Sequence, residues 1–210
     1  AASIEVLAAR LRRVLEAMTA DVTARLSGID VVDVGERGRL EVWGNTVAAG
    51  AGSVGVSVPE VFAAQVARAP GAVAVRFAGQ SLTYAELDAA SNRLAHYLVD
   101  RGVGPGRCVG VLLPRSAEAI VAILAVLKTG ATYVPIDPAH PDERIGFVLA
   151  DAGAAAVITT ASLRSRVDPY GVAVVDIEDE GIAAQPGTPL PVPAPDDIAY
   201  VIYTSGTTGT

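Results

Sequence analysis

A run of glycine and hydroxyl residues, "TSGTTG", spans Thr204 to Gly209 and has the composition of an anion site. Gly206 and Gly209 lack a Cβ atom, so the backbone amides beside them can approach a phosphate closely. Successive amides in such a loop can form a nest for an anion. Hydroxyl groups supply further donors, and they belong to Thr204, Ser205, Thr207 and Thr208. The alternative is a flexible Ser/Thr/Gly tail without a ligand.

The loop differs from a Walker phosphate loop, because the Gly-Lys-Ser/Thr ending is missing. The segment before it, "IAYVI" at 198–202, predicts a buried strand. The loop would then stand at the end of a strand, which is where α/β sheets bind ligands. The residues alone therefore leave two interpretations open for this loop, a phosphate site and a flexible tail.

The elements that must position the loop alternate along the chain from Ser57 onward. Ser57 with Glu60 and Thr83 with Glu86 have capping-box spacing, so each pair predicts the start of a helix. Ala78-Gly79 separates two short strand patterns and predicts a hairpin. Further strands are predicted at 108–113, 132–136 and 154–159, with helices at 116–130 and 141–153. This alternation indicates an α/β fold with a mainly parallel sheet.

The first part of the chain has a different pattern. Residues 3–18 predict an amphipathic helix with a basic face and an apolar stripe, which needs a partner to cover it. The stripe consists of Ile4, Leu7, Leu11, Val14, Leu15 and Met18. Residues 47–56, "VAAGAGSVGV", read as a linker of small residues. Trp43, just before it, is expected to be a packed anchor.

The overall composition excludes several classes of protein. A net charge of -7 argues against a surface for nucleic acid or for anionic lipid, and no apolar run reaches membrane-spanning length. The single cysteine, Cys108, fits a reducing compartment such as the cytoplasm and is expected to pack in a strand. We expect no metal site, because His and Cys do not cluster at ligand spacing. Lys128 is expected to have a structural role at a helix C-terminus.

Three stretches resemble one family of ligases. "YTSGTTG" (Tyr203 to Gly209) is similar to the phosphate-loop motif of the adenylate-forming ligases. "LTYAEL" (Leu82 to Leu87) and "LKTGATYVPIDP" (Leu127 to Pro138) resemble the first two core motifs of the amino-acid adenylation domains of nonribosomal peptide synthetases. "LKTGATYVPIDP" departs from the family's pattern at Thr129 and Thr132, where alanine is usual.

The resemblance covers nearly the whole chain and implies three parts. Residues 1–27 resemble the C-terminal tail of a condensation domain and 28–56 an interdomain linker, including the "WGNT" before the adenylation start. Residues 57–210 resemble the N-terminal subdomain of the adenylate-forming ligase fold, incomplete because Pro-Lys-Gly is expected to follow Thr210. We therefore expect the chain to be a piece of a longer synthetase.

The implied activity is the conversion of an amino acid and ATP, with Mg²⁺, to aminoacyl-AMP. The amino acid would then be loaded as a thioester on the phosphopantetheine of a carrier domain, beside a condensation domain of the same synthetase. The resemblance assigns phosphate binding to Thr204, Ser205, Gly206, Thr207, Thr208 and Gly209. It places no catalytic residue and no metal ligand in this chain. The identity of the amino acid stays open.

Two alternatives to this interpretation remain. A stand-alone acyl-CoA or aryl-acid ligase would share the phosphate loop, although "LKTGATYVPIDP" and the condensation-like beginning argue against it. A non-catalytic module is the other alternative, in which the first 56 residues dock neighbouring domains together.

We predict that these 210 residues alone do not adenylate an amino acid, because the family's amino-acid pocket and mobile lysine follow the phosphate loop. The measurement is amino-acid-dependent exchange between ATP and pyrophosphate. Exchange above the background of a chain-free control would contradict the prediction.

Overall fold

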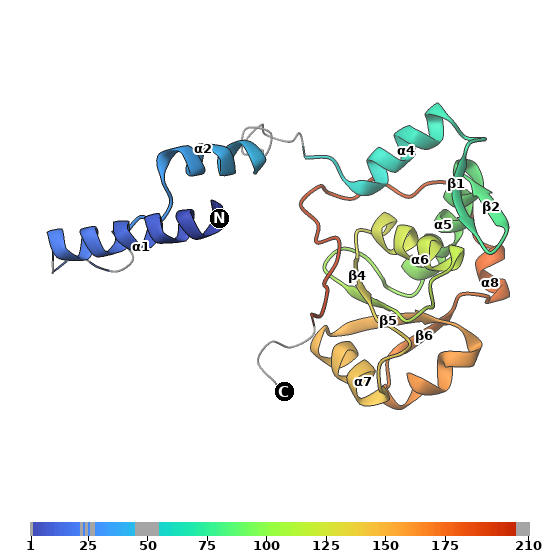
Figure 1. The fold of residues 1–210 in the computed structure, drawn as a ribbon. Coiled ribbons are helices and arrows are strands. Elements are labelled where there is room, and N and C mark those ends of the chain that lie inside the picture. The colour runs from blue at the N-terminus through green and yellow to red at the C-terminus, as the bar shows by residue number, and fades with distance from the viewer. Residues whose placement is uncertain (1, 22, 24, 26–27, 45–54, 205–210) are drawn as a thin grey trace. The chain divides into compact units, whose positions relative to one another are not determined.

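The computed structural model describes residues 2–21, 23, 25, 28–44 and 55–204 (Figure 1). The chain divides into two compact units, Ala1–Val54 and Gly55–Thr210. The division falls near the end of the linker predicted at 28–56. The boundaries predicted inside the first unit, at 27 and 28, stay a prediction.

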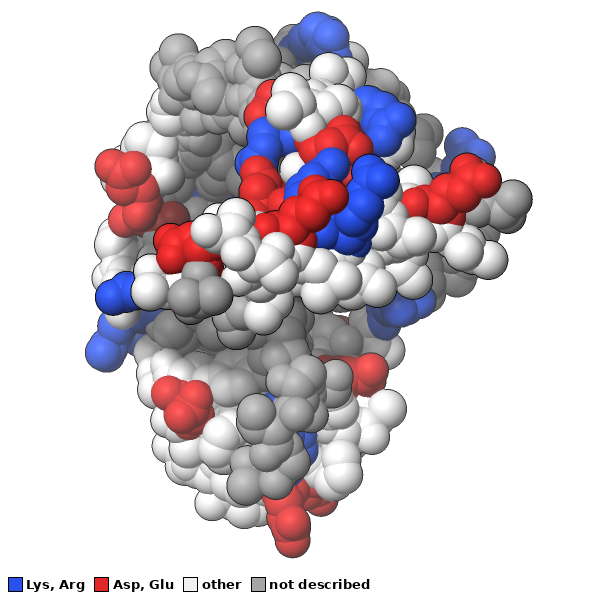
Figure 2. All heavy atoms as spheres, turned by 60° about the vertical axis from the view of Figure 1, so that its left-hand side comes forward, with Lys and Arg blue, Asp and Glu red and all other residues white. Residues whose placement is uncertain are grey.

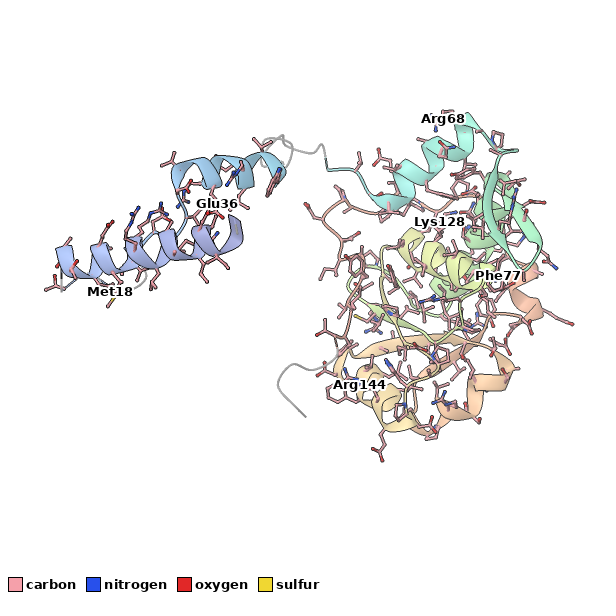
Figure 3. All side chains as sticks on the ribbon, viewed as in Figure 1. Met18, Glu36, Arg68, Phe77, Lys128 and Arg144 are labelled. Atoms are coloured by element: carbon pink, nitrogen blue, oxygen red, sulfur yellow. The ribbon has the colours of Figure 1, made fainter. Side chains whose placement is uncertain are left out.

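The first unit contains the helices α1 (Ala2–Ala20) and α2 (Val34–Trp43). Arg10 of α1 forms an ion pair with Glu36 of α2, and Figure 3 shows the Glu36 side chain between the two helices. Arg13 donates a hydrogen bond of 3.3 Å to the Val31 carbonyl, just before α2. The helices thus meet through the polar face of α1, and α2 occupies part of the predicted linker.

Five of the six side chains of the apolar stripe of α1 are exposed, and Val14 is partly buried. The exposed side chains are Ile4, Leu7, Leu11, Leu15 and Met18, with Leu11 at 60%. Trp43 is 75% exposed, so the prediction that it is a packed anchor is wrong. The physical reason is that charged groups join the two helices, which leaves their apolar side chains facing outward.

The second unit begins with α4 (Val58–Arg68), whose N-cap Ser57 accepts a hydrogen bond from the Glu60 amide. The predicted hairpin follows, with β1 (Val73–Phe77) and β2 (Gln80–Thr83) paired antiparallel. Ala78 and Gly79 both have positive φ angles, of 48° and 80°, as the tight turn requires. Thr83 and Glu86 make both hydrogen bonds of the capping box that starts α5 (Tyr84–Val99), as the sequence predicts.

A parallel sheet forms the centre of the second unit. Its strands are β3 (Cys108–Val111), β4 (Thr132–Pro135), β5 (Ala154–Thr159) and β6 (Ala173–Asp176), in the order β4-β3-β5-β6. All three neighbouring pairs are parallel. The predicted helices α6 (Ala117–Lys128) and α7 (Asp142–Asp151) lie between the strands along the chain. The prediction of an α/β fold with a parallel sheet is confirmed.

Helices cover both faces of this sheet. In Figure 1, α5 and α6 lie over one face and α7 lies over the other. Each face has its own core cluster, centred on residues such as Leu94 and Val126 on the first and Ile145 and Leu149 on the second. Cys108 is partly buried against the second cluster, in agreement with its expected packing role.

Close contact between α7 and the sheet depends on a glycine in β3. A Cβ atom on Gly110 would lie 2.8 Å from a methyl group of Leu149 and 3.2 Å from a methyl group of Val157. The absence of a side chain therefore lets α7 pack directly on the strand. Three short elements follow β5 that the sequence pattern did not reveal: η2 (Ala161–Arg166), η3 (Asp168–Tyr170) and α8 (Glu180–Ala183).

Surface charges of both signs lie together on one face of the molecule (Figure 2). On the face drawn in Figure 2, basic and acidic side chains lie beside one another in the upper part of the view. Among the residues that could be searched, no helix combines the length and the apolar character needed to cross a membrane.

Lys128, the last residue of α6, is buried beneath α5. Its Nζ atom donates hydrogen bonds of 2.7 Å to Asp88 Oδ1, Ser91 Oγ and Asn92 Oδ1. Burial lowers the pKa of Lys128, and the nearby Asp88 carboxylate opposes that shift. The structural role expected for Lys128, the last residue of α6 (Figure 3), therefore includes a polar connection to α5.

We predict that Lys128→Met lowers the free energy of unfolding by about 3 kcal/mol, because Asp88 Oδ1 and Asn92 Oδ1 lose the charged donor that they share. The measurement is chemical unfolding followed by circular dichroism. Arg68→Met is the control, since Arg68 lies at the end of α4 and bonds only to Gln65 among the described side chains. Equal unfolding midpoints for the two variants would contradict the prediction.

Candidate functional site

The segment that leads to the candidate phosphate loop lies along the outer edge of β4. The Tyr133 amide donates a hydrogen bond of 3.1 Å to the Ala199 carbonyl, and the Val201 amide donates one of 3.1 Å to the Tyr133 carbonyl. Thr132 adds a side-chain bond of 2.9 Å to the Ile198 carbonyl. Tyr200 and Tyr133 form a parallel bridge. The segment therefore runs in the same direction as β4.

The prediction of a buried strand at 198–202 is wrong in its burial. Ile198, Tyr200 and Ile202 are 66%, 53% and 59% exposed, and the pairing is an isolated bridge. A segment at the edge of a sheet has a neighbour on one side only, and no described residue covers its outer side. The apolar composition that predicted burial is therefore compatible with an exposed edge here.

The direction of this segment places Thr204 at the carboxyl end of the sheet. Tyr200 is opposite Tyr133, and β4 ends two residues later at Pro135. Thr204 is the fourth residue after Tyr200, so it lies beyond the carboxyl end of β4. Parallel α/β sheets bind their ligands at this edge. The loop therefore begins at the end of a strand, as the sequence predicts.

Of the six residues that the sequence assigns to the site, the structure describes Thr204, which is exposed. Ser205, Gly206, Thr207, Thr208 and Gly209 lie outside the described residues. Their role in phosphate binding stays a prediction.

Tyr203, the residue before Thr204, is attached to α7. Its hydroxyl group donates a hydrogen bond of 2.6 Å to Asp151 Oδ2. Its ring meets the ring of Phe147 edge to face, with centroids 6.2 Å apart. Burial raises the pKa of Tyr203 to about 12, and the hydrogen bond to Asp151 adds to the shift. Tyr203 therefore stays protonated at neutral pH and keeps this hydrogen bond.

A second loop at the same edge is held by Arg166 of η2. Arg166 donates 2.6 Å hydrogen bonds to Asp142 Oδ1 and to the His140 carbonyl, and it also bonds to the Pro138 carbonyl. The Tyr170 hydroxyl donates to the Asp142 carbonyl. Together these bonds fix the turn between β4 and α7. The sequence analysis missed both residues, because contacts from one element to a distant loop leave no local pattern.

A cavity of about 370 Å³ opens beside this turn. It is lined by the ends of β3 and β4 and includes Arg115, Asp137 and His140. Arg115 is exposed at the start of the turn before α6, so its charge is accessible from the carboxyl edge. These polar side chains share the edge at which the candidate loop begins.

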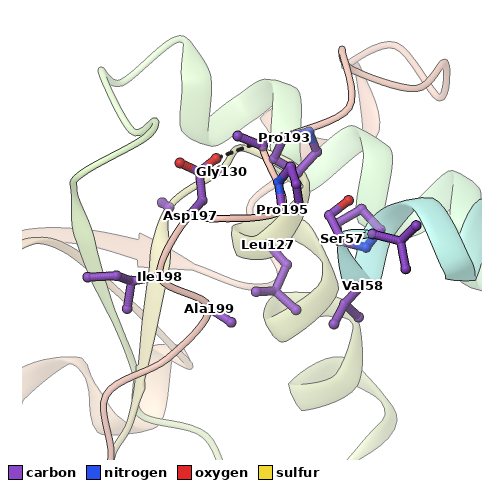
Figure 4. Close-up of a pocket in the computed structure, with 13 residues that line it drawn as sticks. Ser57, Val58, Leu127, Gly130, Pro193, Pro195, Asp197, Ile198 and Ala199 are labelled. Atoms are coloured by element: carbon purple, nitrogen blue, oxygen red, sulfur yellow. Dashed lines mark hydrogen bonds between the residues drawn. The ribbon is translucent and has the colours of Figure 1, made fainter. Parts of the chain in front are cut away.

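The pocket in Figure 4 has a different character. Its volume is about 110 Å³, and it is lined by Ser57, Leu127, Pro193, Pro195 and Asp197 among others. The Asp197 carboxylate already accepts a hydrogen bond of 3.0 Å from the Ala194 amide, drawn as a dashed line. The lining is mainly aliphatic, and the Asp197 carboxylate already has a hydrogen-bond donor. This pocket is therefore unsuited to binding a phosphate.

Several known synthases are similar to this chain in sequence. The isonitrile lipopeptide synthase of Mycobacterium tuberculosis is 52% identical over 210 residues, which are 100% of this chain and 8% of that protein. The chain spans less than a tenth of the length of the curated relatives it matches.

Solved structures share the fold. The nonribosomal peptide synthetase FmoA3 in its AMPPNP-bound form superposes with a TM-score of 0.73 at 35% identity, covering 96% of this chain and 22% of that one. The N-terminal subdomain of Klebsiella oxytoca NpsA, in complex with 3-hydroxybenzoyl-AMSN, gives a TM-score of 0.65 at 31% identity. This match covers 73% of this chain and 39% of that one.

The family model described as AMP-binding enzyme matches residues 62–210, which include the sheet, the helices that cover it and the candidate loop. The resemblance to nonribosomal peptide synthetases that the motifs imply is therefore confirmed, and this chain belongs to the AMP-binding enzyme family.

Proposed function

We propose that the complete protein is a nonribosomal peptide synthetase and that residues 57–210 form the N-terminal part of its adenylation domain. In this proposal the domain activates an amino acid with ATP. One observation carries the proposal: the family match spans the same residues whose parallel sheet delivers Thr204 to the carboxyl edge. The AMPPNP-bound state of the similar FmoA3 supports a nucleotide as ligand, since AMPPNP is an analogue of ATP.

The proposed reaction has two steps. A carboxylate oxygen of the amino acid attacks the α-phosphorus of ATP, and the bond from that phosphorus to the bridging oxygen breaks, which releases pyrophosphate. The thiol of a carrier-domain phosphopantetheine then loses its proton and attacks the carbonyl carbon of the aminoacyl-AMP. A thioester forms and AMP leaves.

The contribution of this chain is to bind and orient the phosphates. The proposed ligands are the backbone amides and hydroxyl groups of Thr204 to Gly209. Charge develops on the departing pyrophosphate, so donors held at that position stabilise the transition state. Tyr203, attached to Asp151, provides a fixed start for the loop.

Mg²⁺ would neutralise phosphate charge during the reaction. Within the described ranges, no three His, Cys, Asp or Glu side chains converge as metal ligands would. The proposed partners are the carrier and condensation domains of the same synthetase. The proposed location is the cytoplasm, which the single free cysteine supports.

A second proposed function concerns the first unit. We assign residues 1–27 to the tail of a condensation domain and residues 28–56 to the linker. The exposed stripe on α1 supports this assignment, because an amphipathic helix gains stability by covering its apolar side chains. The polar side of α1 is already engaged with α2, so the stripe remains free for a neighbouring domain of the synthetase.

The stand-alone ligase alternative is tested by the same assays. An acyl-CoA ligase would exchange pyrophosphate in response to an aryl or acyl acid and would transfer the acyl group to coenzyme A. A synthetase would respond to an amino acid and load its own carrier domain.

We predict that Gly206→Val in the complete protein lowers kcat for pyrophosphate exchange about 10²–10³-fold. This is the usual effect of losing one hydrogen-bond donor to the transition state. A branched side chain at Gly206 would hold the loop amides away from the phosphates. Selectivity across a panel of amino acids should stay unchanged, since residues after this loop form that pocket. Near-normal exchange would remove phosphate binding from the loop, and a changed amino-acid preference would assign it to the pocket instead.

We predict that Leu11→Asp destabilises the complete protein by several kcal/mol, because a carboxylate would replace an apolar contact with the neighbouring domain. Ala9→Asp is the matched control, since it adds the same group on the opposite side of α1. Thermal unfolding of both variants is the measurement. In the isolated chain, where Leu11 is exposed, both should unfold like the wild type. Equal stability of both variants in the complete protein would mean that the stripe faces solvent there.

A further inference from the structure

One face of α7 is directed at the start of the candidate phosphate loop. Arg144, Phe147 and Asp151 are spaced by three and four residues, so they share one face of the helix. Two of them hold Tyr203, through the ring of Phe147 and the carboxylate of Asp151. Figure 3 shows Arg144 on α7, on the side where the described part of the chain ends.

Arg144 contacts both aromatic rings of this cluster. Its Cζ atom lies 5.2 Å from the centroid of Phe147 and 5.8 Å from the centroid of Tyr203. A guanidinium group at such distances is attracted to the negative face of an aromatic ring. The side chain is partly buried, and the two rings restrict where its planar head can lie.

The guanidinium group also reaches the backbone of the loop. Arg144 Nη2 lies 3.5 Å from the Thr204 carbonyl oxygen, which is a long hydrogen bond. Among the described residues, Arg144 forms no ion pair with a carboxylate; the arginines that do so are Arg10, Arg12, Arg37, Arg164 and Arg166. Its charge is therefore available at the residue from which the candidate loop begins.

We propose that Arg144 is a positioning residue for the phosphate loop, acting through Tyr203 and Thr204. It fixes the direction in which the chain leaves Tyr203, so that the amides after Thr204 meet the phosphates of ATP. This inference rests on the proposed function, since it assigns to α7 a role in the same nucleotide site.

Loss of the Arg144 contacts is expected to change KM for ATP much more than KM for the amino acid. A displaced loop would weaken interactions with the phosphates and leave the amino-acid pocket unaltered. Arg144→Gln should therefore raise KM for ATP about tenfold, the order expected from losing one hydrogen bond made by a charged group. KM for the amino acid should change less than twofold. Arg144→Lys keeps the charge but loses the planar head, so it should give an intermediate KM for ATP.

The test is pyrophosphate exchange in the complete protein, with the concentrations of ATP and the amino acid varied separately. Arg164→Gln is the matched control, because it removes the same charge from an exposed arginine on η2 whose ion pair with Asp168 is 3.5 Å long. Thermal unfolding of each variant accompanies the kinetics. Hydrogen exchange of residues 198–204 is compared with that of β5 in the same samples.

An ATP-selective rise in KM, with faster hydrogen exchange at 198–204 and unchanged exchange in β5, would support the inference. Kinetics equal to those of Arg164→Gln would overturn it, and so would an equal loss for both substrates with a lowered melting temperature. The variant Gly206→Val distinguishes failure of the inference about Arg144 from failure of the proposed function. If Gly206→Val keeps near-normal exchange of pyrophosphate, phosphate binding by the loop is wrong and the inference fails with it. If Gly206→Val loses this exchange while Arg144→Gln behaves like Arg164→Gln, the proposed function stands and only the inference fails.

Discussion

The parallel alignment of residues 198–203 with β4 is the constraint on which the candidate site depends. Two backbone hydrogen bonds around Tyr133 set the direction of the segment. Because that direction is parallel, the segment delivers Thr204 to the carboxyl edge of the sheet. An antiparallel alignment would place the same residues at the opposite edge, away from the ends of β3 and β4. The position of Thr204, where the loop begins, therefore follows from backbone pairing before any side chain acts.

The sequence predicts the second unit well, because its signals are local. Thr83 with Glu86 and Ala78 with Gly79 fix a helix start and a turn through neighbouring residues. The parallel sheet follows from the alternation of strands and helices. The composition of Thr204 to Gly209 also predicts anion binding, and this stays a prediction, since only Thr204 lies within the described residues.

The features that the sequence does not predict depend on distant contacts. Arg144 and Arg166 have ordinary positions in their helices, and only the fold brings them to the loops that they contact. For Trp43 and the segment 198–202, the sequence predicts a burial that the structure does not have. Their apolar character indicates burial, but a side chain is buried only if another element covers it, and composition carries no information about that element.

The central claim is that the loop starting at Thr204 holds the phosphates of ATP at the carboxyl edge of the sheet. A crystal structure of the complete protein with AMPPNP tests it directly. We expect the β- and γ-phosphate oxygens to lie about 3 Å from backbone amides of the loop, the distance of a hydrogen bond. Phosphates bound elsewhere, with the loop amides directed away from them, would contradict the claim.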